Sequence, residues 1–378
     1  MNKVVFLMRD FRMGGGEKST IFLMNQLDRS RFNISVIVLD DAGPLKDELA
    51  SDVNLVSLHS SQGNAFQFLP RQILLSRKLR TILKKIDPDV VVGTSWFLNL
   101  TAAKIVCDIH SMNARLLLIN HNPVRNLVFR STCFGLLAPV KRLITGISLR
   151  RADKVIAITD IMRDDLKEVL KLSDSSVVVI FNGISCGSTM EAARSADISD
   201  MTTPYFVSVG RLEYEKGVDL LLQAFEKISH LLPHRLLIIG DGSMRKNLEQ
   251  QAEHAHLAGK VCFIGELPNP YPVMKRSEFL VLSSRWDAFP YVILESLALE
   301  LPIISTDCEG PVKILGNGEY GLLVKRGAVT ELAEAMLRFA TDSSLRDSYK
   351  LRSFARAMDF DSCAMIKQYE SLFCDSEC

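Results

Sequence analysis

Short apolar runs that alternate with helical patterns constrain the fold of this chain more than any other feature of its sequence. The runs are rich in Val, Ile and Leu and almost continuous in hydrophobicity, as expected of strands that are buried on both faces. Helical patterns lie between most of them, for example at Val218–Ser229 and Pro290–Leu299. This alternation predicts an α/β fold in which helices cover both faces of parallel sheets. The expected strands are Val4–Met8, Ile34–Leu39, Val90–Gly93, Leu116–Asn120, Val155–Ile158 and Val177–Phe181 in the first half, and Tyr205–Val209, Arg235–Ile239, Val261–Ile264, Phe279–Leu282, Ile303–Ser305 and Leu322–Val324 in the second.

The pattern occurs twice, and a chain of 378 residues is long enough for two domains. The polar stretch SCGSTMEAARSADISDMTTP, which follows Asn182-Gly183, is typical of a linker between them. Ligands of doubly wound sheets bind at the carboxyl ends of the strands, so we expect a site where two Rossmann-like domains face each other across a cleft. The expected organisation is a first domain over 1–188, a linker over 189–202, a second domain over 203–350, and a C-terminal segment over 351–378, helical from about Ser353 to Phe373, that packs back on the first domain.

Composition and cysteine spacing exclude several classes of protein. With 47% hydrophobic and 24% charged residues, the chain is neither disordered nor a small disulfide-stapled protein. The uncharged apolar stretch Val90–Ala103 is too short to span a membrane, and the apolar run before Arg9 is too short for a signal peptide. The eight cysteines are scattered without a CxxC pair, which predicts reduced thiols in the cytosol and no metal site.

The net charge of +1 hides an asymmetry between the two halves. Residues 1–195 carry a net charge of +8, and the rest of the chain carries −7. Two segments of the first half, 70–86 and 109–152, hold six and seven Lys or Arg residues and no acidic residue. Solvated helix faces would explain either segment alone, whereas the pair favours an anionic partner. The interleaved Leu, Ile, Phe and Val residues favour a membrane surface or a lipid phosphate over nucleic acid.

Two motifs of the first half fall at the ends of expected strands. Three glycines, Gly14 to Gly16, open a helix after the first strand, where backbone N–H groups can approach a phosphate. A dinucleotide-binding fingerprint would need glycine at position 19, where this chain has Ser19. Asp40, however, ends the second strand, where a ribose-binding acid would lie, so a dehydrogenase remains an alternative. His121 follows the fourth expected strand, where it is either a structural histidine or a site residue.

The second half has more such residues. Arg211 and Lys216 follow the first strand of this half, beside the start of a helix, where two cations can bind a diphosphate without a metal. Asp287 precedes a helix that Pro290 opens, and Glu295 lies about one and a half turns into it, so both carboxylates can face one cleft. Gly310-Pro311 then begins a turn whose free N–H groups could meet phosphate.

At these residues the chain resembles the retaining glycosyltransferases of family 4, which have the GT-B fold. The likeness covers nearly the whole length and is strongest over 203–325. The family pattern GRL…KG is matched at Gly210–Leu212 and Lys216-Gly217, and IIGDG at 238–242; FIGELPNPYPVMKRS at 263–277 also follows the family. The signature Glu-x7-Glu appears as Asp287-x7-Glu295, with Ala288 in place of the usual glycine. At Pro290 and Gly310-Pro311 the chain is similar to a subgroup of this family that builds bacterial surface glycans on polyprenyl diphosphate carriers.

The resemblance implies a role for each matching residue. Arg211 and Lys216 would hold the diphosphate and stabilise the departing nucleotide, His121 and Asp287 would contact the donor sugar, and Glu295 would bind the ribose hydroxyls. These five are the expected catalytic residues. No cofactor or divalent metal is implied, and Asp87-Pro88-Asp89 is interpreted as a connector. The positions expected to bind the donor are Gly15, Gly16, Gly210, Gly265, Leu267, Ala288, Phe289, Pro290, Glu295, Gly310 and Pro311.

The resemblance therefore implies transfer, with retention and without a metal, of a hexose or N-acetylhexosamine from a nucleotide sugar. UDP as the carrier and a lipid-linked bacterial surface glycan, such as an O-antigen or capsule, as the acceptor follow from the resemblance. The expected location is the cytoplasm, in peripheral contact with the inner face of the cytoplasmic membrane, without nucleic acid. Alternatives are a nucleotide-sugar epimerase of the same fold and a non-catalytic transferase-like subunit, followed by the dehydrogenase.

Overall fold

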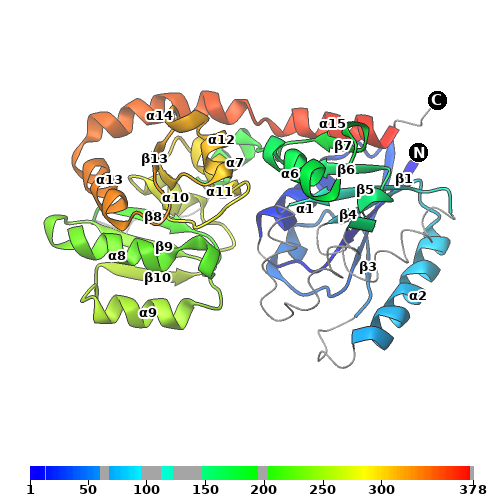
Figure 1. The fold of residues 1–378 in the computed structure, drawn as a ribbon, viewed down its shortest axis with the longest axis horizontal. Coiled ribbons are helices and arrows are strands. Elements are labelled where there is room, and N and C mark those ends of the chain that lie inside the picture. The colour runs from blue at the N-terminus through cyan, green and yellow to red at the C-terminus, as the bar shows by residue number, and fades with distance from the viewer. Residues whose placement is uncertain are drawn as a thin grey trace. The chain divides into compact units, whose positions relative to one another are not determined.

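The computed structural model describes residues 1–12, 14–59, 68–94, 112–121, 146–147, 149–194 and 203–374 (Figure 1). The chain forms two compact units, Met1–Phe181 with Met365–Cys378, and Asn182–Ala364. Each unit is built on a parallel sheet flanked by helices, so the predicted α/β class with two Rossmann-like domains is confirmed.

The sheet of the first unit has seven strands in the described ranges, in the order β3-β2-β1-β4-β5-β6-β7. All neighbours are parallel, and β1 lies between β2 and β4, with Val5 opposite Ser35 on one side and Val91 on the other. The strands are β1 Asn2–Met8, β2 Phe32–Val38, β3 Asn54–Ser57, β4 Val90–Thr94, β5 Arg115–Asn120, β6 Lys154–Ala157 and β7 Val177–Val179.

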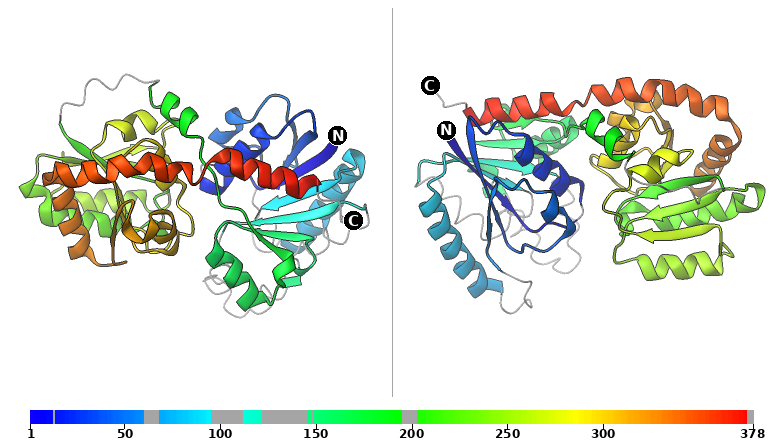
Figure 2. Two further views of the ribbon diagram at one scale, coloured as in Figure 1. Left: turned by 90° about the horizontal axis from the view of Figure 1, so that it is seen from above. Right: turned by 180° about the vertical axis from the view of Figure 1, so that it is seen from behind.

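The described helices of this unit are α1 Gly15–Gln26, α2 Phe68–Ile86, α6 Asp160–Leu170 and most of α15 Ser362–Cys374, with 3-10 turns η1 Pro44–Glu48 and η5 Asp174–Ser176. Helix α15 lies against this unit (Figure 2) because Phe373 is buried edge-on against Phe6 and Phe32. Arg31 and Glu370 form an ion pair at its side, with 3.1 Å between Nη1 and Oε2.

The second sheet has six strands in the described ranges, in the order β10-β9-β8-β11-β12-β13, and all neighbours are again parallel. The strands are β8 Tyr205–Val209, β9 Arg235–Ile239, β10 Val261–Gly265, β11 Leu280–Leu282, β12 Ile303–Thr306 and β13 Leu322–Val324. The helices are α7 Cys186–Ala192, α8 Val218–Ile228, α9 Arg245–His254, α10 Tyr271–Arg276, α11 Tyr291–Ala298, α12 Glu309–Ile314, α13 Val329–Thr341 and α14 Ser343–Met358, with η6 Tyr214–Lys216, η7 Ser229–Leu231 and η8 Gly316–Gly318.

Helix α8 illustrates how the sequence builds this unit. Its buried residues include Val218, Leu221 and Phe225, whose spacing places them on one helical face. The Phe225 ring packs edge-on against Phe206 of β8, and Phe206 stacks on Phe279 with 4.7 Å between the ring centroids. Helix α13 packs beside α8 over the same core, so one face of the sheet is closed by these amphipathic helices.

The observed domain limits differ from those expected. The first unit ends at Phe181 and not at residue 188, because α7 packs against α10, α11 and α14 of the second unit. The expected linker, 189–202, therefore includes the end of a helix, and residues 195–202 lie outside the described ranges.

The C-terminal segment also differs from the single helix expected from Ser353 to Phe373. It forms two helices, α14 and α15, because Phe360 and Ser362 form backbone hydrogen bonds with Ile184 and so break the helical ladder. Residues up to Ala364 belong to the second unit, and those from Met365 belong to the first. In the described part of the chain, no helix is long and apolar enough to cross a membrane.

Candidate functional site

The candidate site is at the carboxyl edge of the second sheet, where the strand order reverses. The chain leaves β8 toward β9 on one side, and it leaves β11 toward β12 on the other. Strands β8 and β11 are neighbours, and the chain continues from them to opposite sides of the sheet, which is the position where ligands bind in doubly wound sheets. These two loops carry Arg211 and Lys216, and Asp287.

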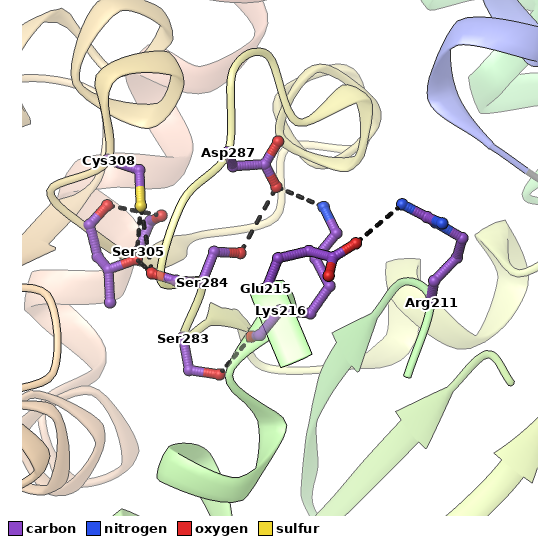
Figure 3. A network of polar contacts seen from close by, with 9 residues as sticks. Arg211, Glu215, Lys216, Ser283, Ser284, Asp287, Ser305 and Cys308 are labelled. Atoms are coloured by element: carbon purple, nitrogen blue, oxygen red, sulfur yellow. Dashed lines mark hydrogen bonds and ion pairs between the residues drawn. The ribbon is translucent and has the colours of Figure 1, made fainter. Parts of the chain in front are cut away.

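Lys216 and Asp287 meet across this switch point (Figure 3). Lys216 Nζ is 2.5 Å from Asp287 Oδ2, and the two side chains are 25% and 11% exposed. Ser284 Oγ is 3.5 Å from the same carboxylate oxygen. Lys216 and Asp287, two of the site residues expected from the sequence, are 71 residues apart and form a partly shielded ion pair.

Glycine is required where the two loops approach each other. Gly217 ends η6 with φ of +63°, a left-handed conformation that favours glycine. A Cβ atom at Gly217 would lie 2.2 Å from the carbonyl oxygen of Ser283. The predicted Lys216-Gly217 pair is thus explained locally, because only glycine allows Lys216 to lie this close to the end of β11.

Arg211 lies at the exposed side of the same loop. Its Nη2 is 3.1 Å from Glu215 Oε1, and its side chain is 54% exposed. Glu215 is a neighbour that the sequence analysis missed, although the spacing of four residues from Arg211 signalled a pair. The guanidinium stays accessible to an anionic ligand, since a surface ion pair of this kind contributes little stability.

Glu295 lies in a separate contact on α11. It is 4% exposed, and its Oε1 accepts a hydrogen bond of 2.9 Å from the hydroxyl of Tyr271 at the start of α10. The prediction named Glu295 and not Tyr271, because no local pattern links the two residues, which are 24 apart. Tyr271 orients the carboxylate that is expected to bind ribose.

Gly310 contacts the backbone of the loop that carries Asp287. Its N–H donates to the carbonyl oxygen of Asp287 at 3.1 Å, and Pro311 has no N–H. The Gly310 N–H is therefore not available to phosphate, while the expectation for the rest of this turn stays a prediction. Gly310 instead supports the loop, because a Cβ atom there would lie 2.5 Å from the carbonyl oxygen of Ala288.

The other expected donor-binding residues of this unit lie at strand ends or around the same loop. Gly265 ends β10 with φ of +84°, and its carbonyl oxygen accepts a hydrogen bond from Gly240. Gly210 follows β8, and a Cβ atom at Gly240 would lie 2.0 Å from the carbonyl oxygen of Gly210. The remaining four are Leu267 and Ala288, which are partly buried, and Phe289 and Pro290, which are buried just before α11.

In the first unit, Gly15 and Gly16 begin α1, and Gly16 lies beside His121. A Cβ atom at Gly16 would be 3.1 Å from Cγ of the imidazole. Burial lowers the pKa of His121 to about 4, so the ring is neutral at pH 7. The loop after β1 and the end of β5 therefore bring the expected glycines and histidine together.

The remaining sequence candidates are placed elsewhere. Asp89 lies at the amino end of β4, opposite the carboxyl edge of the sheet, and its carboxylate accepts a hydrogen bond of 2.7 Å from the N–H of Lys3. Within the described ranges, no group of three His, Cys, Asp or Glu residues could hold a metal ion. The basic segment 70–86 lies within α2, whereas residues 109–111, 122–145 and 148 of the segment 109–152 lie outside the described residues.

Comparison with known proteins agrees with this geometry. The chain matches the model of Glycosyltransferase Family 4 over residues 13–187 and that of Glycosyl transferases group 1 over residues 189–356. Each of the two domains thus matches a glycosyltransferase family model. The second family domain contains the paired loops of Lys216 and Asp287.

Relatives and a solved structure extend the comparison. The chain is 27% identical, over 66% of its length and 67% of the relative, to the N-acetylgalactosamine-N,N'-diacetylbacillosaminyl-diphospho-undecaprenol 4-alpha-N-acetylgalactosaminyltransferase of Campylobacter jejuni. It is 32% identical, over 44% of its length, to the lipopolysaccharide core biosynthesis glycosyltransferase LpsE of Rhizobium meliloti, of which the match spans about half (48%). HepE of Anabaena, solved with UDP and glucose, shares the fold, with a TM-score of 0.77, 16% identity and coverage of 98% of this chain and 99% of that one. The GT-B fold is therefore confirmed.

Proposed function

We propose that the chain is a retaining glycosyltransferase that moves a hexose or N-acetylhexosamine from a UDP-sugar to a lipid-linked bacterial glycan. The observation that carries the proposal is the contact of 2.5 Å between Lys216 and Asp287 at the switch point of the second sheet, with Arg211 in the same loop. Both family domains support sugar transfer. The name of the Campylobacter relative, which includes a diphospho-undecaprenol acceptor, supports the lipid-linked glycan.

The two cations fit the charge of the leaving group. Cleavage of a nucleotide sugar leaves a negative charge on a diphosphate, and charge-assisted hydrogen bonds from Lys216 and Arg211 would stabilise it as it develops. A divalent metal often supplies that charge in phosphate sites. Because two side-chain cations stand at the proposed site, we propose that transfer needs no metal, so activity should persist in EDTA.

The proposed reaction breaks the bond between the anomeric carbon and the diphosphate oxygen, and the electron pair stays on the diphosphate. The acceptor hydroxyl oxygen bonds to the same face of the anomeric carbon, and its proton passes to the departing diphosphate. No enzyme nucleophile is required. Asp287 is assigned to the donor sugar and Glu295 to the ribose, while the neutral ring of His121 can donate a hydrogen bond to the sugar without adding charge.

Helix α2 supports an anionic membrane surface as the place where the acceptor is met. Between residues 74 and 86 it carries no acidic residue, and its Arg77, Lys84 and Lys85 side chains are exposed together with Leu74, which is 68% exposed. Cations next to an exposed apolar residue favour anionic lipid. Flotation with anionic vesicles should fall in the double variant Lys84→Glu/Lys85→Glu, and binding that ignores both charge and salt would contradict this assignment.

The function is tested by release of nucleoside diphosphate from UDP-, GDP- and ADP-sugars in EDTA, with and without an extract of polyprenyl diphosphate glycans. We expect release from a UDP-sugar that depends on the extract, with the product linkage keeping the donor's anomeric configuration by NMR. Lys216→Met should lower kcat/KM by about 10²–10³-fold. Lys227→Met, which changes an exposed lysine on α8, is the matched control and should stay within twofold.

Three outcomes would overturn the proposal. Tight UDP binding without release from any donor would favour the non-catalytic subunit. Conversion of a UDP-sugar without the extract would favour the epimerase. Full activity of Lys216→Met would show that the diphosphate is bound elsewhere.

A further inference from the structure

Arg285 joins the two loops that carry Lys216 and Asp287. It lies two residues before Asp287, in the loop after β11. Its guanidinium holds the carboxylate of Asp219 with two hydrogen bonds, Nη1 to Oδ1 at 2.8 Å and Nη2 to Oδ2 at 2.6 Å. The guanidinium carbon also lies 4.1 Å from the centroid of the Tyr214 ring. One side chain thus contacts both η6 and the first turn of α8.

The backbone of η6 is held along its whole length by the same loop. The carbonyl oxygen of Tyr214 accepts a bond of 2.9 Å from Arg285 Nη1, and that of Glu215 accepts one of 2.8 Å from the Arg285 N–H. The carbonyl oxygen of Lys216 accepts one of 3.1 Å from Ser283 Oγ. Three successive carbonyls are therefore bonded by residues 283 and 285, and Arg285 supplies two of the three donors.

The charge of Arg285 is directed into the protein and not toward a ligand. The side chains of Arg285 and Asp219 are 19% and 21% exposed, so the pair is largely shielded from water. A paired, planar guanidinium of this kind fixes geometry more firmly than a lysine could, because it forms a fork and stacks on a ring. Arg285 is thus suited to fixing the position of a neighbour.

We propose that Arg285 is a positioning residue, which with Asp219 locks η6 onto the loop after β11 and so holds Lys216 Nζ at Asp287. Its effect on catalysis rests on the sugar transfer proposed above. A cation displaced by about 1 Å from a developing charge costs about 10²-fold in rate. Loss of the lock should therefore lower activity although Arg285 contacts no substrate.

The test compares Arg285→Lys, which keeps the charge but loses the fork and the stacking, with the unmodified protein. We expect kcat/KM for the donor to fall about 10–100-fold, mainly through kcat, with Asp219→Asn giving a similar loss. Arg326→Lys is the matched control, because Arg326 forms an exposed pair with Asp307 at 3.4 Å near the end of β13. It should stay within twofold, and a loss equal to that of Arg285→Lys would overturn the proposal.

A double-mutant cycle separates positioning from a general structural role. If Arg285 acts through Lys216, Arg285→Lys should cost less than about threefold in a Lys216→Met background. A full 10–100-fold loss in that background would refute the proposal.

Amide hydrogen exchange tests the lock without any substrate. Exchange at residues 214–217 should become at least tenfold faster in Arg285→Lys and stay unchanged in Arg326→Lys. Unchanged exchange in Arg285→Lys would refute the lock, whereas absence of sugar transfer by the unmodified protein would refute only the proposed function.

Discussion

Gly310 lies against the backbone of the loop that carries Asp287, and its replacement by alanine should disturb that loop directly. The added Cβ atom would lie 2.5 Å from the carbonyl oxygen and 2.6 Å from the carbonyl carbon of Ala288, and 2.9 Å from the carbonyl oxygen of Asp287. All three are backbone atoms, so the clash with the added Cβ atom cannot be relieved by rotation of a side chain. The loop or α12 must move, which strains the bond of 3.1 Å from the Gly310 N–H to the Asp287 carbonyl.

The magnitude follows from these two effects. Forcing extra carbon into a packed site typically costs about 1–3 kcal/mol. A weakened backbone hydrogen bond adds about 0.5–1.5 kcal/mol. Gly310→Ala should therefore lower the free energy of unfolding of the second unit by about 2–4 kcal/mol, and its Tm by about 6–12 °C at roughly 3 °C per kcal/mol for this size. Movement of Asp287 should also weaken UDP binding.

Trp286, next to Asp287, is a local reporter for this prediction. The chain has two tryptophans, so a Trp96→Phe background leaves Trp286 as the single fluorophore. Thermal unfolding followed by its emission, together with calorimetric titration of UDP, gives both readouts. The matched control is Gly187→Ala in α7, where a Cβ atom would meet nothing within 4 Å. The control should be neutral or more stable by up to about 1 kcal/mol. A Gly310→Ala variant as stable as the control would refute the steric reasoning.

Three further predictions concern other parts of the molecule. The pKa of His121, about 4 in the folded state, lies below the ordinary value of 6.5, so the unfolded chain binds more protons as the pH falls. Between pH 7 and pH 5, the free energy of unfolding should fall by about 2 kcal/mol more in the unmodified protein than in His121→Gln, as measured by urea unfolding. Equal losses in the two proteins would contradict the lowered pKa of His121. Tyr271→Phe removes the donor to the buried Glu295 and should cost about 1–3 kcal/mol in thermal unfolding and weaken UDP binding, whereas no change in either would refute the orienting role. Phe373→Ala should destabilise the first unit by about 3–5 kcal/mol in urea, while Phe354→Ala, at an exposed position of α14, should change stability by no more than about 0.5 kcal/mol. Similar values for the two variants would show that α15 does not pack as described.

The strands were predicted well because buried parallel strands leave a local mark on the sequence. Tyr205–Val209, Arg235–Ile239 and Leu322–Val324 coincide with β8, β9 and β13. The prediction omitted β3, Asn54–Ser57, because this edge strand has exposed or partly buried residues and no continuous apolar run. An apolar run reports burial, so a strand at the sheet edge carries a weaker signal.

The prediction of one C-terminal helix was wrong in detail for a different reason. Residues 353–373 have a helical pattern throughout, and nothing local signals the break between α14 and α15. The break depends on two backbone hydrogen bonds with Ile184, which is distant in sequence: its N–H donates to the carbonyl oxygen of Phe360, and its carbonyl oxygen accepts from the N–H of Ser362. Contacts over such separations depend on how the chain folds back, and periodicity contains no information about them.

The sequence alone determined the fold class, the two sheets, and which polar residues would stand at the strand ends. These properties follow from local hydrophobic periodicity and from the placement of glycine and charge. The tertiary structure decided how those residues are used. It paired Lys216 with Asp287, bound Arg285 to Asp219, oriented Glu295 through Tyr271, and used the Gly310 N–H within the protein. Each contact joins segments brought together by the order of strands in the sheet, and that order is set by the packing of the whole unit.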